Sequence, residues 1–236
     1  MSLAGSHILI VGGTKGIGRA TAVAALAAGA RVTATGRSAE SLATRPEGVT
    51  GALLDFTDPA SVAALAEGLG SVDHMVLSAS DAVAWGGFAE VGEDALRAAF
   101  EAKFWGYWRV IRALAPKLSA HGSITLVTGA AARAALPGTS GLAAVNGALE
   151  AMAGVLAVEL APRRVNTVSP GMTATEAYAG LPDEARKGMF AATVAKLPVG
   201  RIGAPEDIAQ AVLLAAANPF VTGATLDVDG GAHLAR

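Results

Sequence analysis

Three glycines near the start of the chain have the spacing of an anion-binding turn. An apolar run, His7–Val11, leads into Gly12, Gly16 and Gly18, and an alanine-rich helical pattern follows. Glycine lets the backbone approach a ligand closely, and the free N–H groups and dipole at a helix start attract an anion. The order of strand, glycine turn and helix favours a dinucleotide diphosphate here, with an ordinary tight strand-to-helix turn as the alternative.

The residues after the second apolar run, Arg31–Thr35, bear on which dinucleotide would bind. A fold that prefers NAD usually places an acidic side chain here to hold the ribose 2′-hydroxyl, and this chain has Gly36 and Arg37 instead. The Arg37 guanidinium suits a 2′-phosphate, and Lys15 in the glycine turn supplies a second cation. The pattern predicts NADP(H), with a solvated surface arginine as the alternative.

Polar side chains also follow the third and fourth apolar runs, Thr50–Leu54 and His74–Ser78. Asp55 is placed to accept a hydrogen bond from an adenine amino group, or to cap the helical pattern that follows. Ser80 and Asp81 lie at the carboxyl end of the fourth run, where parallel sheets bind ligands, although Asp81 suits a loop cap equally well. We therefore expect both run ends to border one site.

Composition excludes several classes of site. Of the 236 residues, 52% are hydrophobic and 16% charged, which provides for a large core. The net charge of −2 gives no basic footprint for nucleic acid. The chain has no cysteine, which excludes disulfides and thiolate chemistry. The histidines are scattered without the spacing of ligands, so we predict no metal site.

Seven apolar runs alternate with helical patterns along the chain, which is the order of a doubly wound parallel sheet covered by helices on both faces. The sequence shows no linker or repeat, so we predict a single α/β domain over residues 1–236. The predicted strands are His7–Val11, Arg31–Thr35, Thr50–Leu54, His74–Ser78, Ser123–Thr128, Arg164–Val168 and Thr225–Val228.

The sequence shows no pattern typical of export or membrane insertion. The apolar run from Ile8 is short and ends in glycines, unlike a signal peptide. The uncharged stretch from Ile208 to Leu226 is interrupted by Gln210 and Asn218, unlike a membrane-spanning helix. We predict a soluble cytoplasmic protein that does not bind membranes.

Taken together, these residues resemble the short-chain dehydrogenase/reductase family over nearly the whole chain. The resemblance implies a single Rossmann domain with a seven-stranded parallel sheet, a homo-oligomer (usually a tetramer, otherwise a dimer) and a nicotinamide dinucleotide. The matching segments are Gly12-x-x-x-Gly16-Ile17-Gly18, Gly36-Arg37, Asp55, Arg164-Val165-Asn166-Thr167-Val168-Ser169-Pro170-Gly171, Leu197-Pro198-Val199-Gly200-Arg201, Ala204-Pro205-Glu206-Asp207-Ile208-Ala209, Val221-Thr222-Gly223 and Val228-Asp229-Gly230-Gly231.

The resemblance also implies which residues hold the cofactor. The Pro170-Gly171 segment would pass the nicotinamide, and Thr173 and Thr175 match positions that contact its carboxamide and the diphosphate. The predicted cofactor contacts are Gly12, Thr14, Lys15, Gly16, Ile17, Gly18, Arg37, Asp55, Phe56, Ser78, Ala79, Ser80, Pro170, Gly171, Thr173 and Thr175.

The catalytic positions depart from the family pattern of Asn, Ser, Tyr and Lys. In the family the Tyr transfers the proton, the Lys lowers its pKa, the Ser orients the substrate carbonyl, and the Asn anchors a relay water. Counting along the matching segments, these positions hold Lys103, Gly129, Leu142 and Asn146. Leucine cannot donate a proton, and such acid help is typically worth about 10²–10⁴-fold, so ordinary carbonyl reduction should be severely slowed.

Lys103 and Asn146 have exchanged the two residue types that the family uses. We hypothesise that the Lys103 ammonium reaches the space left by the shorter Asn146 and restores a cation near the nicotinamide ribose. The alternative is coincidence, with Lys103 on the helix surface. Thr128 is the candidate to replace the missing Ser hydroxyl in part.

Tyr107 is another candidate acid, because it lies one turn after Lys103 on the same predicted helix. Trp105 and Trp108 lie beside it. Burial of all three aromatic side chains in an interface between subunits is the alternative, and we favour it.

The residues support three functional interpretations. The favoured one is an NADP(H)-dependent oxidoreductase with an atypical active site, acting on a small, mostly apolar molecule. The second is an NADP(H)-binding protein without turnover, acting as a sensor or partner subunit. The third is a non-redox enzyme that keeps the fold. The apolar substrate is inferred from the segment between Gly171 and Gly200, which carries Met172, Tyr178, Leu181, Met189, Phe190 and Leu197.

Overall fold

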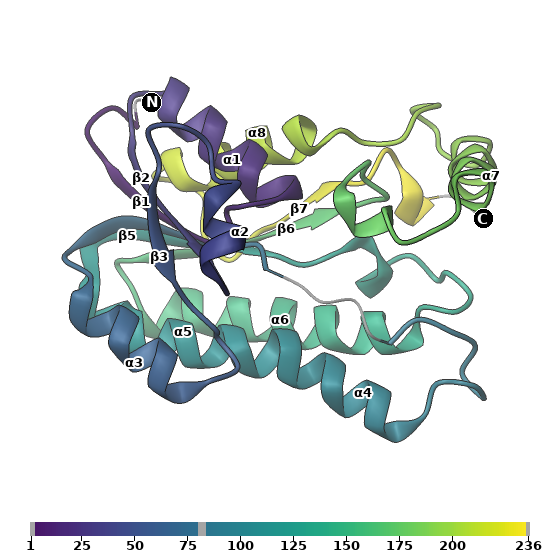
Figure 1. Cartoon of the computed structure of the whole chain (residues 1–236), viewed down its shortest axis with the longest axis horizontal. Coiled ribbons are helices and arrows are strands. Elements are labelled where there is room, and N and C mark those ends of the chain that lie inside the picture. Colours follow the sequence, from purple (N-terminus) through teal and green to yellow (C-terminus); the bar gives the residue numbers. More distant parts are fainter. Residues whose placement is uncertain (1–2, 80–83, 235–236) are drawn as a thin grey trace.

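The computed structural model of the chain describes residues 3–79 and 84–234, and within them seven strands form one parallel sheet (Figure 1). The strand order is β3-β2-β1-β4-β5-β6-β7. This arrangement confirms the predicted α/β class and the doubly wound Rossmann fold. The strands are β1 (His7–Val11), β2 (Arg31–Gly36), β3 (Thr50–Leu53), β4 (Val72–Leu77), β5 (Leu118–Val127), β6 (Arg164–Pro170) and β7 (Thr225–Val228).

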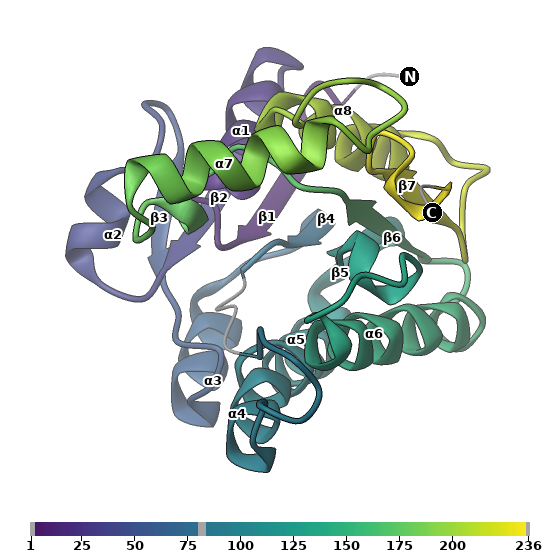
Figure 2. The same cartoon turned by 90° about the vertical axis from the view of Figure 1, so that its right-hand side faces the viewer.

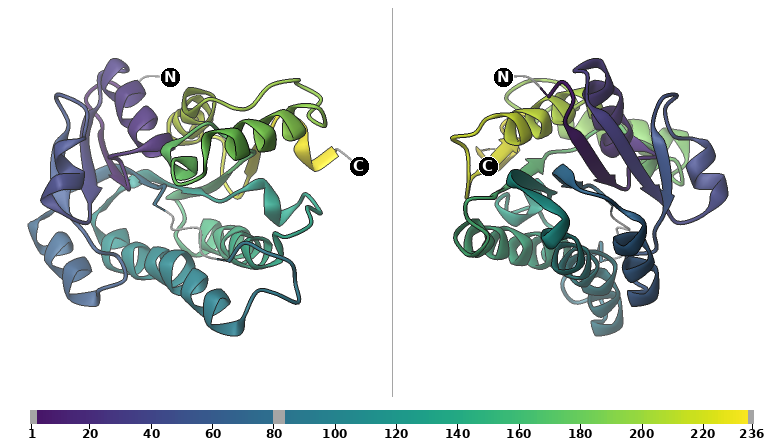
Figure 3. Two further views of the ribbon diagram at one scale, coloured as in Figure 1. Left: turned by 45° about the vertical axis from the view of Figure 1, so that its right-hand side comes forward. Right: turned by 90° about the vertical axis from the view of Figure 1, so that its left-hand side faces the viewer.

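Helices cover both faces of the sheet (Figures 1 and 3). Helices α1 (Gly16–Ala27) and α8 (Pro205–Ala217) pack on one face, and α3 (Pro59–Gly68), α5 (Gly106–Leu114) and α6 (Ser140–Glu159) on the other. The shorter or peripheral helices are α2 (Ala39–Ala43), α4 (Glu93–Ala99), the π-helical η1 (Phe100–Trp105), α7 (Asp183–Val194) and the 3₁₀ turns η2 (Ala115–Lys117), η3 (Ala130–Ala132), η4 (Glu176–Tyr178) and η5 (Ala232–Leu234).

Strand β1 shows why a strand of this sheet can carry apolar residues without alternation, as Ile8–Val11 does. Its Leu9 and Val11 side chains belong to the core cluster under α3, α5 and α6. Its Ile8 and Ile10 side chains belong to the cluster under α1 and α8. Since both faces of the strand are covered, apolar side chains are favoured on both, and the alternation seen in one-sided sheets is absent from Ile8–Val11.

The chain reverses its direction across the sheet at β1. Strands β1 to β3 extend toward one edge, and β4 to β7 extend from β1 toward the other edge. A ligand crevice is expected beyond the carboxyl ends of the two strands that flank such a reversal, here β1 and β4. Figure 2 shows the molecule turned by 90° from Figure 1, with α7 in front of α1 and α8.

The strand bounds agree with the prediction except at β5. Strands β1 and β7 have the predicted bounds. β2, β3 and β6 differ by one or two residues at the carboxyl end, and β4 begins two residues and ends one residue earlier than predicted. β5 begins at Leu118 instead of Ser123, because Leu118 pairs with Val72 beyond a register shift between Val72 and His74. An interrupted ladder of this kind leaves no apolar pattern in the sequence.

Helix α6 is long and apolar enough to cross a membrane by length and composition alone. Its Val145, Leu149 and Ala153 side chains are buried inside the molecule. Leu149 and Ala153 belong to the core cluster against the sheet. The apolar residues on this face of α6 are therefore explained by its packing against the sheet.

Candidate functional site

The glycine turn after β1 requires glycine for steric reasons. Gly12 and Gly16 have φ angles of +82° and +49°, which side chains other than glycine rarely adopt. A Cβ atom on Gly12 would stand 2.7 Å from the Ala79 Cα, and one on Gly18 would overlap the Gly12 carbonyl oxygen. The turn thus holds the first residues of α1 against the ends of β1 and β4.

The start of α1 is built to accept an anion from elsewhere. Within the helix there is no acidic side chain in the first turn, and Lys15 at the N-cap makes no side-chain capping bond. The first N–H groups of a helix have no partners within it. One of them, the Gly16 N–H, donates to the Glu176 carboxylate at 2.9 Å. A negatively charged oxygen therefore fits here, as a diphosphate would require.

A cleft of about 400 Å³ opens over this turn and extends to the end of β2. Lys15 and Arg37 both line it, so two cations face the space beside the glycine turn. The predicted cofactor contacts that line the cleft are Gly12, Thr14, Lys15, Gly16, Ile17, Arg37, Phe56, Ser78, Ala79 and Thr175. These residues fit a dinucleotide with a 2′-phosphate in charge and in backbone geometry.

Asp55 stabilises the loop after β3 and does not cap a helix. Its Oδ1 atom accepts hydrogen bonds from the Thr57 hydroxyl and N–H at 2.6 and 2.9 Å. These bonds, and then the charge of Arg37, lower the pKa of Asp55. Helix α3 is capped instead by Asp58, which accepts from the Ala60 N–H at 2.9 Å. The capping alternative is therefore wrong, and the adenine contact of Asp55 stays a prediction.

A second cavity, of about 190 Å³, lies at the ends of β5 and β6. Pro170 and Gly171 line it together with Thr173, whose hydroxyl donates to the Gly171 carbonyl at 3.0 Å. A Cβ atom on Gly171 would stand 2.6 Å from the Asp229 Cα, so glycine is needed for this close passage. The cavity adjoins the cleft, since both are lined by Ile17, Ser78, Thr175 and Ala177.

Lys103 is buried at this second cavity, with 8% of its surface exposed. Its Nζ atom donates to the Asn146 Oδ1 at 2.8 Å and to the Thr128 carbonyl at 3.0 Å. Burial lowers the pKa of Lys103 to about 8, and the charge of Glu150 opposes that shift. The contact between Lys103 and Asn146 that the exchange hypothesis requires is confirmed, and the surface-lysine alternative is wrong.

A change of helix type accompanies the burial of Lys103. The residue lies in η1, a π-helical segment between α4 and α5. A π-helical turn contains more residues than an α-helical one, so it changes which side chains face the interior, and such turns are frequent at functional sites. The α-helical periodicity used in the sequence analysis gives no sign of it.

A third cavity, of about 700 Å³, adjoins the second at Lys103 and Thr128. Most of its lining is apolar. Its apolar side chains include Leu142, Val145, Met172, Met189 and Leu197. Phe190, predicted to line the substrate space, instead packs edge-to-face on Tyr178, with ring centroids 5.4 Å apart. The three cavities form a path from the glycine turn, past Lys103, to an apolar space.

Comparison with known proteins assigns the family. A family model described as Enoyl-(Acyl carrier protein) reductase matches residues 11–233. The Short-chain dehydrogenase/reductase ATR9 of Stachybotrys chlorohalonatus is 33% identical, over 99% of each chain. The chain belongs to the short-chain dehydrogenase/reductase family. The D-erythrulose reductase of Gallus gallus is 32% identical, over 98% of this chain and 97% of that protein.

Solved structures agree with this assignment. A small-chain dehydrogenase in complex with NADPH is 37% identical with a TM-score of 0.84, over 98% of this chain and 99% of the other. A second short-chain dehydrogenase/reductase family protein is 36% identical with a TM-score of 0.87, over 99% and 100% of the two chains. As a member of this family, the chain is an oxidoreductase.

In this short-chain dehydrogenase/reductase, Thr128 binds Lys103 through its backbone carbonyl, while its hydroxyl is engaged elsewhere. Its hydroxyl has two acceptors within reach, the Glu150 carboxylate at 3.0 Å and the Val168 carbonyl at 3.3 Å, and donates its single proton to one of them at a time. Its carbonyl oxygen is the group that binds Lys103. The sequence analysis did not identify Glu150, although it lies four residues after Asn146 on α6, a spacing that places two side chains on one helix face.

Tyr107 is a core residue of the short-chain dehydrogenase/reductase and not an interface residue. It is 0% exposed within the single chain, and its hydroxyl donates to the Ala79 carbonyl at 2.8 Å. Burial raises the pKa of Tyr107 far above its usual range, which makes it a poor acid. The prediction of interface burial is therefore wrong for Tyr107, whereas Trp105 and Trp108 are 45% and 40% exposed.

Three further predicted residues do not line the cleft or the cavities. One of them supports the glycine turn, and two lie outside the residues that the structure describes. Gly18 lies under the turn, where its missing side chain gives room to the Gly12 carbonyl. Ser80 and Asp81 lie outside the described residues.

Proposed function

We propose that this short-chain dehydrogenase/reductase depends on NADP(H) and reduces a small, mostly apolar carbonyl or imine compound at an atypical site centred on Lys103. The observation that carries the proposal is the contact between Lys103 and Asn146 at the point where the dinucleotide path meets the apolar cavity. The cytoplasmic location and the homo-oligomer stay predictions.

The cofactor assignment rests on the fit of the cleft. The diphosphate would bind the N–H groups at the start of α1, with Lys15 and Arg37 holding the 2′-phosphate. The nicotinamide would lie along Pro170 and Gly171, where Thr173 narrows the cavity. A related small-chain dehydrogenase is known in complex with NADPH, which supports this choice of cofactor. When bound, the reduced nicotinamide supplies the hydride.

Lys103 would supply the positive charge and the proton. Its Nζ atom is held by two acceptors, the Asn146 amide oxygen and the Thr128 carbonyl, so the third proton of the ammonium is the one left for another acceptor. With a pKa of about 8, the group is mostly charged at neutral pH and gives up a proton more easily than a surface lysine. Asn146 and Thr128 act as positioning residues for it.

Leu142 and Gly129, which match the Tyr and Ser positions of the family, support an atypical site. Leu142 lines the apolar cavity and has no proton to donate. A Cβ atom on Gly129 would stand 2.9 Å from the Asn146 Nδ2, so a serine here would crowd the amide that holds Lys103. The absence of a side chain at Gly129 and the presence of Asn146 are thus sterically coupled.

The first experiment measures binding and turnover. NADPH and NADH are titrated into the protein, and oxidation is followed against a panel of carbonyl and imine acceptors. We expect tighter binding of NADPH and turnover of at least one apolar acceptor. Tight NADPH binding without turnover of any acceptor would replace this proposal with a dinucleotide-binding protein that lacks catalysis.

The second experiment restores the family's residue types at positions 103 and 146, first one at a time and then together. K103N removes the buried cation, and N146K adds a second cation within hydrogen-bonding distance of the first, so each single variant should lose turnover by about 100-fold. The double variant K103N/N146K keeps one lysine and one amide, and should recover at least about tenfold over either single variant. Single variants as active as the natural protein would contradict the role of the pair.

A further inference from the structure

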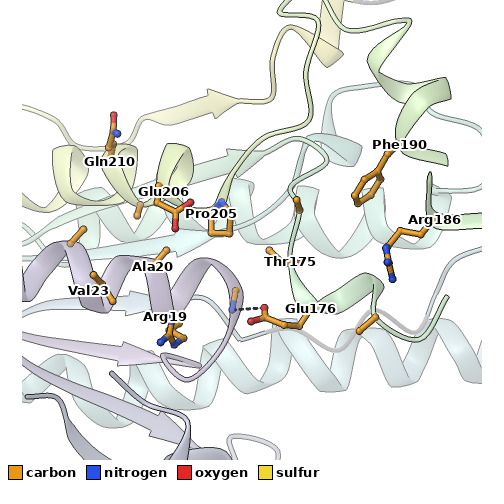
Figure 4. A pocket seen from close by; sticks show the side chains of 15 residues that line it. Arg19, Ala20, Val23, Thr175, Glu176, Arg186, Phe190, Pro205, Glu206 and Gln210 are labelled. Carbon is orange, nitrogen blue, oxygen red and sulfur yellow. Dashed lines mark hydrogen bonds between the residues drawn. The ribbon is translucent and has the colours of Figure 1, made fainter. Parts of the chain in front are cut away.

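The first N–H of helix α1 is already bound by an anion from the chain itself. Glu176 lies in η4, far along the sequence, and its Oε2 accepts from the Gly16 N–H at 2.9 Å. Figure 4 shows the Glu176 side chain directed at the start of α1, at one end of a groove that also contains Thr175, Arg186 and Phe190. The Glu176 side chain is exposed.

This contact replaces a cap that α1 does not have. Neither Lys15 nor the first turn of the helix provides an acceptor for the helix N–H groups. Thr175 packs on the same point, since its Cγ2 atom would lie 3.3 Å from a Cβ atom on Gly16. The η4 turn is therefore held on the glycine turn by one charged hydrogen bond and one side-chain contact.

The cofactor requires the same N–H groups. On the proposed function, on which this inference rests, the dinucleotide diphosphate binds at the start of α1. A diphosphate and a carboxylate cannot share the Gly16 N–H without strong repulsion between like charges. We propose that Glu176 is an internal competitor for the diphosphate, and that its displacement by the dinucleotide repositions Tyr178 at the substrate cavity.

The link to the substrate cavity is the η4 turn. Glu176 and Ala177 line the dinucleotide cleft, and Tyr178, in the same turn, lines the third cavity. The Tyr178 ring packs on Phe190 of α7 at 5.4 Å and an interplanar angle of 84°. We therefore expect release of the Glu176 contact to change the position of a ring that borders the substrate cavity.

Binding titrations test the competition. NADPH and, separately, inorganic pyrophosphate are titrated into the natural protein and into E176Q, E176A and E184Q. The control E184Q removes the same charge from an exposed glutamate of α7 that pairs with Lys187. We expect E176Q and E176A to bind both ligands about three- to tenfold more tightly, and E184Q to stay within about twofold of the natural protein.

Unchanged or weaker binding of both ligands by the Glu176 variants would overturn the proposal. If the natural protein binds neither NADPH nor NADH, the proposed function fails, while tighter pyrophosphate binding by the Glu176 variants would still support the competition at Gly16.

Hydrogen exchange tests the link to Tyr178. NADPH should change amide exchange over residues 175–181 in the natural protein. In E176A the same segment should already show the changed exchange without ligand, because the contact to Gly16 is gone. Exchange in this segment that responds to neither NADPH nor E176A would overturn the link.

Discussion

The shape of the dinucleotide cleft depends on the backbone, whereas the apolar cavity depends on the side chains that line it. The cleft depends on backbone geometry, in particular two positive φ angles and glycines against which a Cβ atom would collide. The polar contacts at the apolar cavity join groups from three separate elements, namely the Lys103 side chain in η1, the Thr128 carbonyl after β5 and the Asn146 side chain in α6. The departures from the family pattern that we predict at catalytic positions lie in the second region.

This difference indicates which parts of the fold can change independently. The glycine turn formed by Gly12, Gly16 and Gly18, which we call the cradle, tolerates little substitution. A Cβ atom on Gly12 would collide with Ala79, and one on Gly18 would collide with the Gly12 carbonyl oxygen. Side chains that meet across a cavity can change together and still place a cation at one point, as we propose for Lys103 and Asn146, which are hydrogen-bonded to each other. Variants that alter each region separately should therefore differ in the kind of damage as well as in its size.

The largest effect is expected from breaking the cradle. G18V places a branched side chain against the Gly12 carbonyl, so it should abolish NADPH binding and lower the free energy of unfolding by about 2–4 kcal/mol. Thermal unfolding and NADPH titration measure both. The control is G147A in α6, where a Cβ atom meets nothing within 4 Å, and which should stabilise the protein by about 0.5–1 kcal/mol. Equal damage from both variants would contradict a specific cradle.

The next effect is expected at the side-chain region. K103M keeps the length of the side chain and removes its charge, so turnover should fall by about 10²–10⁴-fold with the fold intact. Y107F is the matched control, because it removes a hydroxyl from the same helical region. It should keep turnover and lose about 1 kcal/mol of stability with the hydrogen bond to the Ala79 carbonyl. Turnover lost in Y107F and kept in K103M would reverse the assignment.

A pH profile sharpens the same assignment. If Lys103 is the proton donor, kcat/KM should fall as the pH rises through about 8, the pKa to which burial lowers this group. Because the folded pKa lies below the usual value of 10.5, the unfolded chain binds more protons between these two pH values. Stability should therefore rise with pH in that window and be lowest below it. The rise should disappear in K103M, as measured by denaturant unfolding at each pH.

The sequence predicted the cleft well because backbone geometry leaves a local signal. Glycine is needed in this turn because of its φ angles and because a few neighbouring atoms leave no room for a Cβ atom, as at Gly12 and Gly18. The apolar stretches of the strands follow from a sheet that is covered on both faces. The seven strands, their order along the chain and ten of the residues that line the cleft could be predicted this way.

The rest could not be predicted because it depends on contacts between distant elements. The π-helical η1, the early start of β5, and the bond from Glu176 to Gly16 each require knowledge of what lies opposite in space. Tyr107 was misplaced for the same reason, since a helix with several aromatic residues does not show which of them faces the core. The exchange of Lys103 and Asn146 was visible only through the family pattern.

The smallest effect is expected at the rim of the cleft, where we propose that the side chain of Arg37 sets the choice between NADPH and NADH. R37A should weaken NADPH binding by about tenfold and leave NADH binding within about twofold, because the guanidinium would contact only the 2′-phosphate. Parallel titrations with the two dinucleotides measure the ratio. R31A, at the opposite end of β2, is the control and should change neither affinity. If R37A leaves the ratio unchanged, the preference for NADP(H) does not arise from the residue after β2, and Lys15 in the glycine turn becomes the cation to remove next.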